Sequence, residues 1–332
     1  LHLLSRRQRQ MCIRDRDDTI WSLFFVTKKE FFYMQKLSLG VLEKMFRENI
    51  TSKEINFILH IARYQDDRGV IQGIYYKDIC EALNISAQKF YDMIHSLEDK
   101  HIIRTEKNDY TDWDITICGN DFSLYTDEDY RNGTVKYLNV NHALFVNPVF
   151  LGLKAGAKLM AIDMLRIIVT SRATSDKRSY QIGVAKFYDK YKKLLGVEHR
   201  AIQNYLHDLK QLFGVFVKEA KFFFSLNSKH TQRTSRFEQQ EYDEHIIKIS
   251  CRRNRIREYR EDNKRDILTV LSQYRRDIKE AICKGGGFNL SRIVGSSIEI
   301  MNELQPNKYR WRRELKPSLI HKIIRQELGY AE

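Results

Sequence analysis

One supersecondary pattern occurs twice in the chain, at an offset of 112 residues, and this repeat limits the possible folds more than any other feature. Apolar positions of the first copy coincide with apolar positions of the second. The aligned pairs are Tyr76 with Tyr188, Leu83 with Leu195, Ile85 with Val197, Ile94 with Leu206, His95 with His207, and Leu97 with Leu209. Because the alignment runs without gaps through a turn, we expect two units of the same architecture.

The first copy begins with a helix that Thr51 and Glu54 cap, since the hydroxyl and the carboxylate can each bond a free backbone amide of the other residue. A short second helix over residues 75–83 ends at Asn84, which tolerates a left-handed backbone. The serine two residues further on caps a third helix that runs to about Lys100. The side chains expected to face the core are Ile55, Ile58, Leu59 and Ala62, then Ile79, Cys80 and Leu83, then Phe90, Met93, Ile94 and Leu97.

Two predicted strands, at residues 102–105 and 114–117, follow this helix and form a hairpin around a polar tip at 107–110. Gly69 and Gly73 indicate a loop between the first two helices. The order helix, helix, tight turn, helix and hairpin is that of a winged helix-turn-helix.

The second copy repeats this order. Its predicted elements are a helix at 155–170, a polar loop at 171–179, a helix at 184–195, a turn at Gly196 and Val197, a helix at 198–213 that Gly214 ends, and strands at 215–218 and 222–226. Segments 135–140 and 143–150 are expected to be extended and to lead into this copy.

The region after the second copy is basic, and its spacing of apolar residues predicts helices. Residues 251–257 open a charged, exposed helix that becomes amphipathic further on. Three glycines at 285–287 indicate a hinge, and helical segments at 290–304 and 311–328 follow, the second kinked or split by Pro317.

We therefore predict an α+β protein, mostly α, with two winged helix-turn-helix domains in tandem and a basic helical C-terminal region. The predicted division is 1–33 as a non-native leader, 34–125 as the first domain, 126–134 as a linker, 135–237 as the second domain and 238–332 as the helical region.

The leader is set apart because residues 5–16 read SRRQRQMCIRDR, which looks like the translation of a sequencing adapter. Met34 is then the expected start of the protein. The alternative is a basic N-terminal arm that touches nucleic acid.

Charge is divided unevenly along the chain. Residues 34–133 hold 12 basic and 18 acidic side chains, whereas 134–250 hold 19 and 10, and 251–332 hold 19 and 11. A basic half beside an acidic one suggests that the later segments meet a polyanion, while the earlier one contacts protein or reads DNA with fewer phosphate contacts.

Composition favours a soluble, cytoplasmic protein. No stretch reaches the roughly 18 apolar residues of a membrane helix, so no membrane partner is expected. The five cysteines are scattered and form no CxxC, which argues against disulfides and a zinc site. No HExxH, GxSxG or GxxxxGK[ST] motif is present, and we expect no enzyme activity, cofactor, metal or catalytic residue.

The third helix of the second copy carries the side chains suited to reading bases. Arginine can bind guanine in the major groove with two hydrogen bonds, and asparagine or glutamine can bind adenine in the same way. The outward residues there are His199, Arg200, Gln203, Asn204 and His207. The residues expected to contact phosphates are Lys186, Lys192 and Lys193 on the preceding helix, with Lys218 and Lys221 on the hairpin.

The first copy offers fewer such groups. Gln88, Lys89 and Tyr91 hold the corresponding helix positions and Lys107 lies at the hairpin tip, but Asp92 would repel phosphates. We expect the second unit to bind DNA more strongly. In the tail, the further candidates for DNA contact are Arg310, Arg312 and Arg313.

The region between and around the copies resembles the tandem winged-helix initiators of plasmid replication, in pattern and domain order over residues 51–226. The matching residues are Tyr137, Leu138, Leu144 and Phe145, then 153–160 with Ala157, Lys158 and Leu159. The resemblance implies binding to repeated duplex DNA at the origin of a plasmid or mobile element, and recruitment of host replication proteins.

Two other functions remain open. A winged-helix transcriptional regulator would bind an operator, and a helicase-loading or assembly adaptor would use the acidic first unit to dock protein. Homodimerisation is a further possibility that the sequence leaves undecided.

Overall fold

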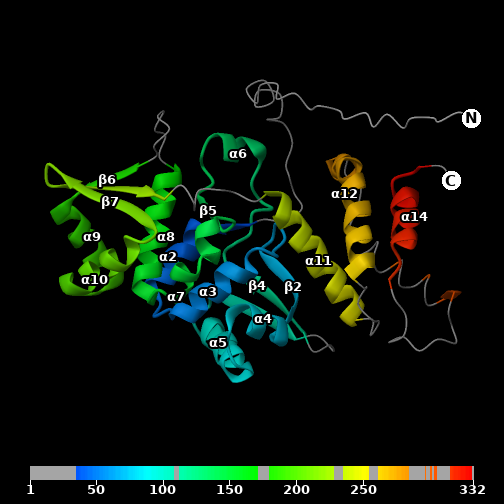
Figure 1. Ribbon diagram of the computed structural model, residues 1–332, viewed down its shortest axis with the longest axis horizontal. Helices are drawn as coiled ribbons and strands as arrows, with labels where there is room; N and C mark the ends of the chain where they lie inside the picture. The colour runs from blue at the N-terminus through cyan, green and yellow to red at the C-terminus, as the bar shows by residue number, and fades with distance from the viewer. Residues whose placement is uncertain are drawn as a thin grey trace, which may run out of the picture.

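The computed structural model describes residues 35–107, 112–170, 179–227, 235–253, 261–283, 296, 300, 303–304 and 315–330. Over these residues the chain is mostly helical, with three small antiparallel sheets (Figure 1). The α+β, mostly α class is therefore confirmed. The adapter-like leader lies outside the described residues.

The first unit contains the helices, the turn and the hairpin expected of it. Its elements are β1 (Lys36–Ser38), α2 (Leu39–Arg47), α3 (Ser52–Ile61), β2 (Val70–Tyr75), α4 (Tyr76–Leu83), α5 (Ala87–Asp99), β3 (Ile103–Lys107) and β4 (Asp112–Ile117). Thr51 and Glu54 form the predicted capping box of α3. Asn84 ends α4 with a left-handed backbone (φ 50°), and the Ser86 hydroxyl accepts a hydrogen bond from the Lys89 amide at the start of α5.

The loop predicted around Gly69 and Gly73 is wrong, because most of it is strand β2. This strand joins β3 and β4 in a sheet of order β2-β4-β3. The register shifts between Ile71 and Ile74, and Gly73 has φ +64°. Such a bulge interrupts the alternation of buried and exposed residues, which is the sequence signal for a strand.

The second unit repeats the arrangement. Its elements are β5 (Tyr137–Asn139), a 3-10 helix (Ala143–Val146), α7 (Pro148–Gly152), α8 (Ala155–Thr170), β6 (Ser179–Gly183), α9 (Val184–Leu195), α10 (His199–Leu209), β7 (Phe213–Lys218) and β8 (Lys221–Leu226). The sheet order β6-β8-β7 has the same pattern as that of the first unit. Between the units, α6 (Asp127–Arg131) lies within the predicted linker.

Three predictions at the edges of these elements are wrong. Helix α10 ends at Leu209, and Gly214 lies inside β7, where it pairs with Ser225. Phe213 is 1% exposed and begins β7 because it completes the core under the sheet. Ser179, expected in a loop, begins β6, whereas residues 171–178 lie outside the described residues.

The extended conformation predicted for 143–150 is also wrong. The segment forms a 3-10 helix and the start of α7. The Asn147 side chain accepts a hydrogen bond from the Val149 amide, and Pro148 occupies the first turn, where its missing N–H costs nothing.

Equivalent elements of the two units contact each other. β1 pairs with β5 in antiparallel register, with Leu37 opposite Leu138, and α3 packs against α8. Buried apolar side chains from Leu37 to Phe224 form one continuous core across both units. The two units are thus held in a fixed relation.

A buried lysine reinforces this contact. Lys158 of α8 is fully buried, and its ammonium donates hydrogen bonds to the Asn56 side chain, to the Ser52 hydroxyl (2.9 Å) and to the Leu151 carbonyl (2.9 Å). Burial lowers the pKa of Lys158 to about 7, and the nearby charge of Lys53 adds to the effect.

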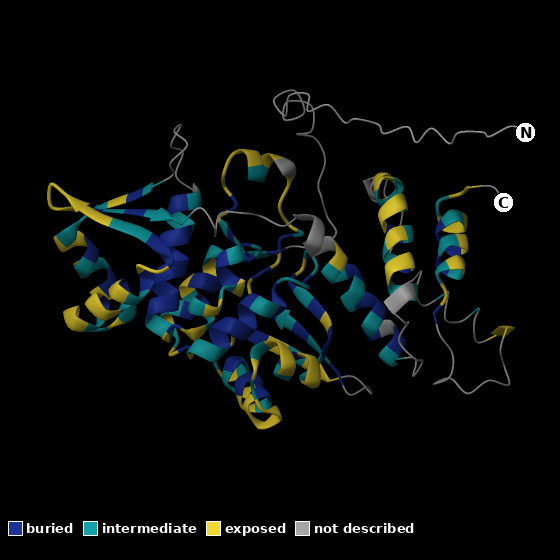
Figure 2. Ribbon diagram, viewed as in Figure 1, coloured by how far each residue is buried: buried dark blue, intermediate teal, exposed yellow. Residues whose placement is uncertain are grey.

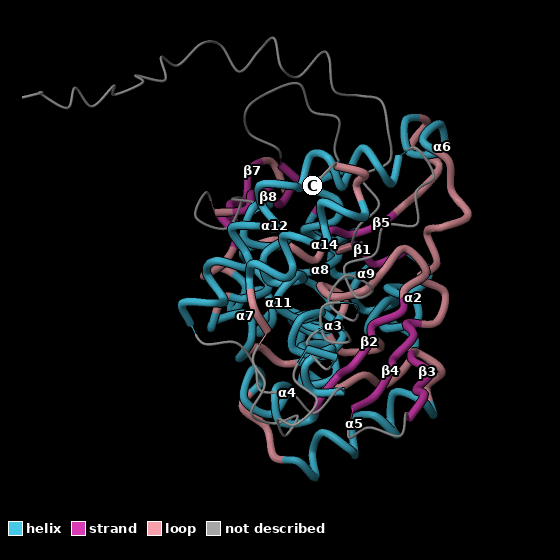
Figure 3. The backbone as a smooth tube through the Cα atoms, turned by 90° about the vertical axis from the view of Figure 1, so that its right-hand side faces the viewer, coloured by secondary structure: helices cyan, strands magenta, loops and turns pink. Residues whose placement is uncertain are grey.

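The tail forms a separate small core. Helices α11 (Ser235–Arg253), α12 (Glu261–Cys283) and α14 (Pro317–Glu327) bury Ile247, Cys251, Ile267, Leu271, Leu315, Ile320, Ile323 and Ile324 together. α12 and α14 lie side by side (Figure 3). Pro317 begins α14 rather than kinking a longer helix, and the three glycines lie outside the described residues.

Candidate nucleic-acid interface

Helices α9 and α10 form the candidate site of the second unit. Gly196, with φ +63°, ends α9 and turns the chain into α10. The buried sides carry Phe187 and Tyr191 on α9 and Ile202, Leu206 and Leu209 on α10. This packing fixes which side of α10 meets solvent.

The predicted base-reading residues lie on that exposed side (Figure 2). Arg200, Gln203, Asn204 and His207 are all exposed and follow one another at helical spacing. Within the described residues, the side chains of Arg200, Gln203 and Asn204 form no hydrogen bond or ion pair. The structure therefore brings these groups together with their donors and acceptors available.

His199 is exposed but has a packing contact. Its ring stacks on Tyr188 of α9 at 3.9 Å between centroids. This contact joins the start of α10 to α9. His207 at the other end lies 3.9 Å from the Asp208 carboxylate, in an exposed pair.

The predicted phosphate-contacting lysines are exposed at two places. Lys186, Lys192 and Lys193 lie along α9, while Lys218 and Lys221 face each other next to the turn of the β7–β8 hairpin. Lys192 is 3.3 Å from Glu198 and Lys218 is 3.8 Å from Glu219. Such exposed pairs contribute little, so both lysines can exchange their partner for a phosphate.

A buried polar cluster holds α9 against α8. Asp163 of α8 accepts hydrogen bonds from the Tyr191 hydroxyl (2.9 Å) and from Arg166 (3.0 Å), and it also pairs with Lys190. Burial, with the Asp163 charge, raises the pKa of Tyr191 well above its usual value. Sequence reasoning missed this cluster, because Lys190 and Tyr191 are 27 and 28 residues from Asp163 in the chain.

The matching face of the first unit is less suited to DNA. Gln88 donates a hydrogen bond to Asp92 (2.8 Å), so its amide already has a partner, and Lys89 is exposed. Tyr91 is only half-buried rather than outward, because its ring packs on Tyr76 and Trp113. Its role as a DNA contact stays a prediction.

The hairpin of the first unit adds one cation. The Lys107 side chain is exposed and lies 5.7 Å from the centre of the Trp113 ring. Residues 108–111, the rest of the expected tip, lie outside the described residues.

Helix α11 covers one side of the first unit. Arg253 bonds Asp112 through two nitrogens (3.1 and 3.2 Å) and Asp114 through one (2.7 Å), and Arg252 pairs with Asp78 (2.7 Å). The helix predicted at 251–257 is thus not a freely exposed one. Cys251 is buried and both arginines bind carboxylates, while residues 254–257 lie outside the described residues.

Further along α11, the contact is made by aromatic and small residues. His245 stacks on Tyr64 (4.5 Å) and hydrogen-bonds the Gln72 carbonyl (2.9 Å), and Ile249 fills the space above Gly73. Burial lowers the pKa of His245 to about 4. The bulge in β2 makes room for this helix.

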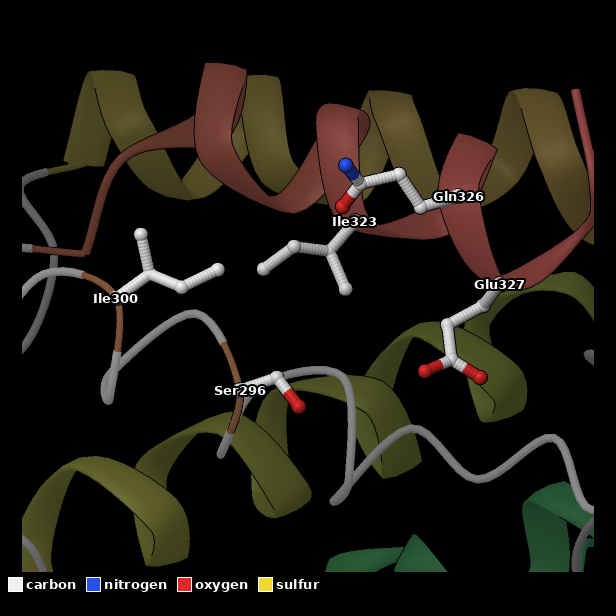
Figure 4. Close-up of a pocket in the computed structure, with 5 residues that line it drawn as sticks. All are labelled: Ser296, Ile300, Ile323, Gln326 and Glu327. Atoms are coloured by element: carbon white, nitrogen blue, oxygen red, sulfur yellow. The ribbon is translucent and has the colours of Figure 1, made fainter. Parts of the chain in front are cut away.

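Arg310, Arg312 and Arg313 lie outside the described residues. A pocket in the tail is lined by Ser296, Ile300, Ile323, Gln326 and Glu327 (Figure 4). Among these five described lining residues, Glu327 is the one with an ionisable side chain.

The described part of the chain contains no group of three or more histidine, cysteine or acidic side chains placed to hold a metal. It also contains no helix with the length and apolar character needed to cross a membrane. Comparison with protein-family models, with curated proteins and with solved structures yields no match to this chain.

Proposed function

We propose that this protein is a non-enzymatic, sequence-specific binder of double-stranded DNA, built from two winged-helix units, and that α10 is its main reading helix. The observation that carries the proposal is the exposed row of Arg200, Gln203, Asn204 and His207, with lysines on both sides. These side chains can form paired hydrogen bonds to guanine and adenine, and the lysines can fix the register on the backbone.

The rigid joint between the units favours a composite binding site. Since α3 packs on α8 and β1 pairs with β5, neither unit can turn freely relative to the other. A site on DNA must then have a fixed spacing between the parts that the two units approach. Repeats of such a site fit an initiator of plasmid or mobile-element replication, the function that the sequence resemblance implies.

A role as an assembly adaptor is the second candidate, and the first unit favours it. The exposed face of its α4 and α5 carries Glu81, Asp92 and Asp99, which repel phosphates. In this case the second unit binds DNA and the first docks a protein of the replication machinery.

The test is binding of the full chain to the DNA that flanks its gene, compared with random DNA of equal length over a series of salt concentrations. We expect a ratio of affinities of about a thousandfold or more and a steep fall with salt. Protection of an array of repeats supports initiation, and protection of one inverted repeat at the promoter supports a transcriptional regulator instead. Equal affinity for both DNAs contradicts the proposal.

A further inference from the structure

The β7–β8 hairpin of the second unit exposes two stacked phenylalanines. Phe216 and Phe223 lie directly opposite each other in the register, with ring centroids 4.8 Å apart and planes within 4°. Phe216 is 56% exposed. Large aromatic side chains are seldom left in this state unless they meet a partner.

The pair lies on the outer face of the sheet. The neighbouring Phe222 and Phe224 are buried and contact Phe187 of α9 at 5.0 and 5.2 Å between centroids. Since successive side chains of a strand point to opposite faces, Phe223 and its partner Phe216 point away from that core. Figure 1 shows the sheet on one side of α9 and α10, with β7 along its rim.

The same face carries two cations next to the rings. Lys218 and Lys221 are two residues beyond Phe216 and before Phe223, so they share the outer face, and they are paired across the strands. Like charges directly opposite each other destabilise a sheet. Within the described residues, Glu219 is the acidic group that pairs with Lys218, at 3.8 Å and with both side chains exposed.

Gly214 and Ser225, which are both small, form the next pair on the same face of the sheet, and Gln181 of β6 lies opposite Phe223. The two rings are therefore larger than the residues of the pair beside them. Because β7 is an edge strand of its sheet, no described strand pairs with it on the side of Phe216 that faces away from Phe223.

We propose that this face binds single-stranded DNA, whose unpaired bases extend the Phe223–Phe216 stack while Lys218 and Lys221 hold the adjacent phosphates. Every base has a flat aromatic face that can stack on phenylalanine, and a row of aromatic and basic side chains is the usual platform for single strands. A base within a duplex has no such face free. The two rings lie on the hairpin and not on α10, whereas Lys218 and Lys221 are shared with the duplex contacts of the proposed function. Stacking on the rings therefore distinguishes this site from the duplex site.

The turn and the strand register fix the backbone conformation of this hairpin. Its two turn residues, Glu219 and Ala220, both have positive φ (50° and 55°), as a tight two-residue turn requires. Five consecutive register pairs between Phe213 and Val217 on β7 and their partners on β8 keep the strands aligned. The stack is therefore preorganised for a ligand.

The experiment measures fluorescence anisotropy of labelled oligo(dT) with the full chain and three variants. Phe216→Ala is expected to weaken binding about tenfold, which is the loss of one stacked base. Val217→Ala is the matched control, since Val217 is equally exposed (58%) but on the other face. Phe216→Leu keeps an apolar strand residue and is expected to behave like Phe216→Ala.

Duplex binding is measured in parallel, and Arg200→Ala is expected to lose duplex affinity while it keeps oligo(dT) affinity. Absence of oligo(dT) binding, or equal effects of Phe216→Ala and Val217→Ala, overturns the proposal. If Phe216→Ala loses as much affinity for the duplex as for oligo(dT), the result overturns the proposal in favour of a duplex contact. A change in sedimentation of Phe216→Ala overturns it in favour of a contact between two copies. Failure of duplex binding alone affects only the function proposed above.

Discussion

The two units share one plan but differ at equivalent positions of the third helix. Gln88 and Asp92 of α5 correspond to Arg200 and Asn204 of α10, at the same offset of 112 residues. In the first unit the glutamine donates to the aspartate, whereas in the second no described residue bonds the arginine or the asparagine. Among the described elements, α11 packs on β2 of the first unit and lies away from α9 and α10 of the second (Figure 1).

This difference indicates that a repeated fold need not keep one function. The first unit has bound part of its own chain through Asp78, Asp112 and Asp114, and the second has kept an open polar face. Variants at equivalent positions of the two units test whether the packing of α11 stabilises the first unit and whether the exposed face of α10 binds DNA.

The largest effect is expected where α11 meets the first unit. Arg253→Ala leaves Asp112, which is fully buried, without its guanidinium, and the loss of a buried ion partner costs about 3 kcal/mol. Denaturant unfolding measures this loss. Arg252→Ala is the control, with an expected loss below about 1 kcal/mol, because Asp78 is half exposed. Equal losses in the two variants would show that α11 does not support the first unit through Asp112.

The next effect concerns reading of DNA. Arg200→Ala is expected to lower affinity for the specific duplex by roughly 1–3 kcal/mol, a factor of about 5 to 150, and to relax preference for one base pair. The equivalent Gln88→Ala should change affinity less than about threefold by the same standard. The affinities of both variants are measured by titration against the DNA site that the protein protects. A larger loss of affinity in Gln88→Ala than in Arg200→Ala would assign the reading of DNA to the first unit.

The pH dependence of stability comes third. Burial lowers the pKa of His245 to about 4 from its usual 6.5, so the folded state resists protonation and the unfolded state does not. Stability that is present above pH 6.5 is therefore lost as pH falls from 6.5 towards 4. His245→Gln keeps a donor for the Gln72 carbonyl and should show a smaller loss between pH 7 and about 5. An unchanged pH profile would place the titration at other groups, such as His60, whose pKa burial also lowers to about 4.

The smallest effect concerns a single phosphate contact. Lys193 of α9 corresponds to Glu81 of α4, so the two units carry opposite charges at one position. Lys193→Ala should reduce the slope of log affinity against log salt by about 1, with a similar change for every DNA sequence. Glu81→Ala should leave the slope unchanged or raise it slightly. Identical slopes for wild type and Lys193→Ala would remove this lysine from the interface.

Local signals in the sequence located most of the helices and the turns between them. Three of these signals act within four residues and were predicted correctly: the capping box of Thr51 and Glu54, and the helix ends at Asn84 and at Gly196. Strand β2 was missed because the bulge at Gly73 breaks its alternation. Gly214 was misread because glycine also suits a strand where a neighbour approaches closely, here the Ser225 side chain.

The contact of α11 with the first unit could not be read from the sequence in the same way. Arg252 and Arg253 look like solvent-exposed cations, and their partners are 139 to 174 residues earlier in the chain. The excess of acidic residues in 34–133 was the available signal. It suggested a contact with protein or fewer phosphate contacts, and it did not point to a helix of the same chain.

The most direct test of the account is photo-crosslinking from two equivalent positions. A benzoylphenylalanine placed at Asn204 or at Asp92, both exposed and 112 residues apart, reports which helix lies against bound duplex. Our account predicts efficient crosslinking to the specific duplex from position 204 and little from position 92. Crosslinking from position 92 alone, or from neither position in a complex that forms, would contradict the claim that α10 reads the DNA.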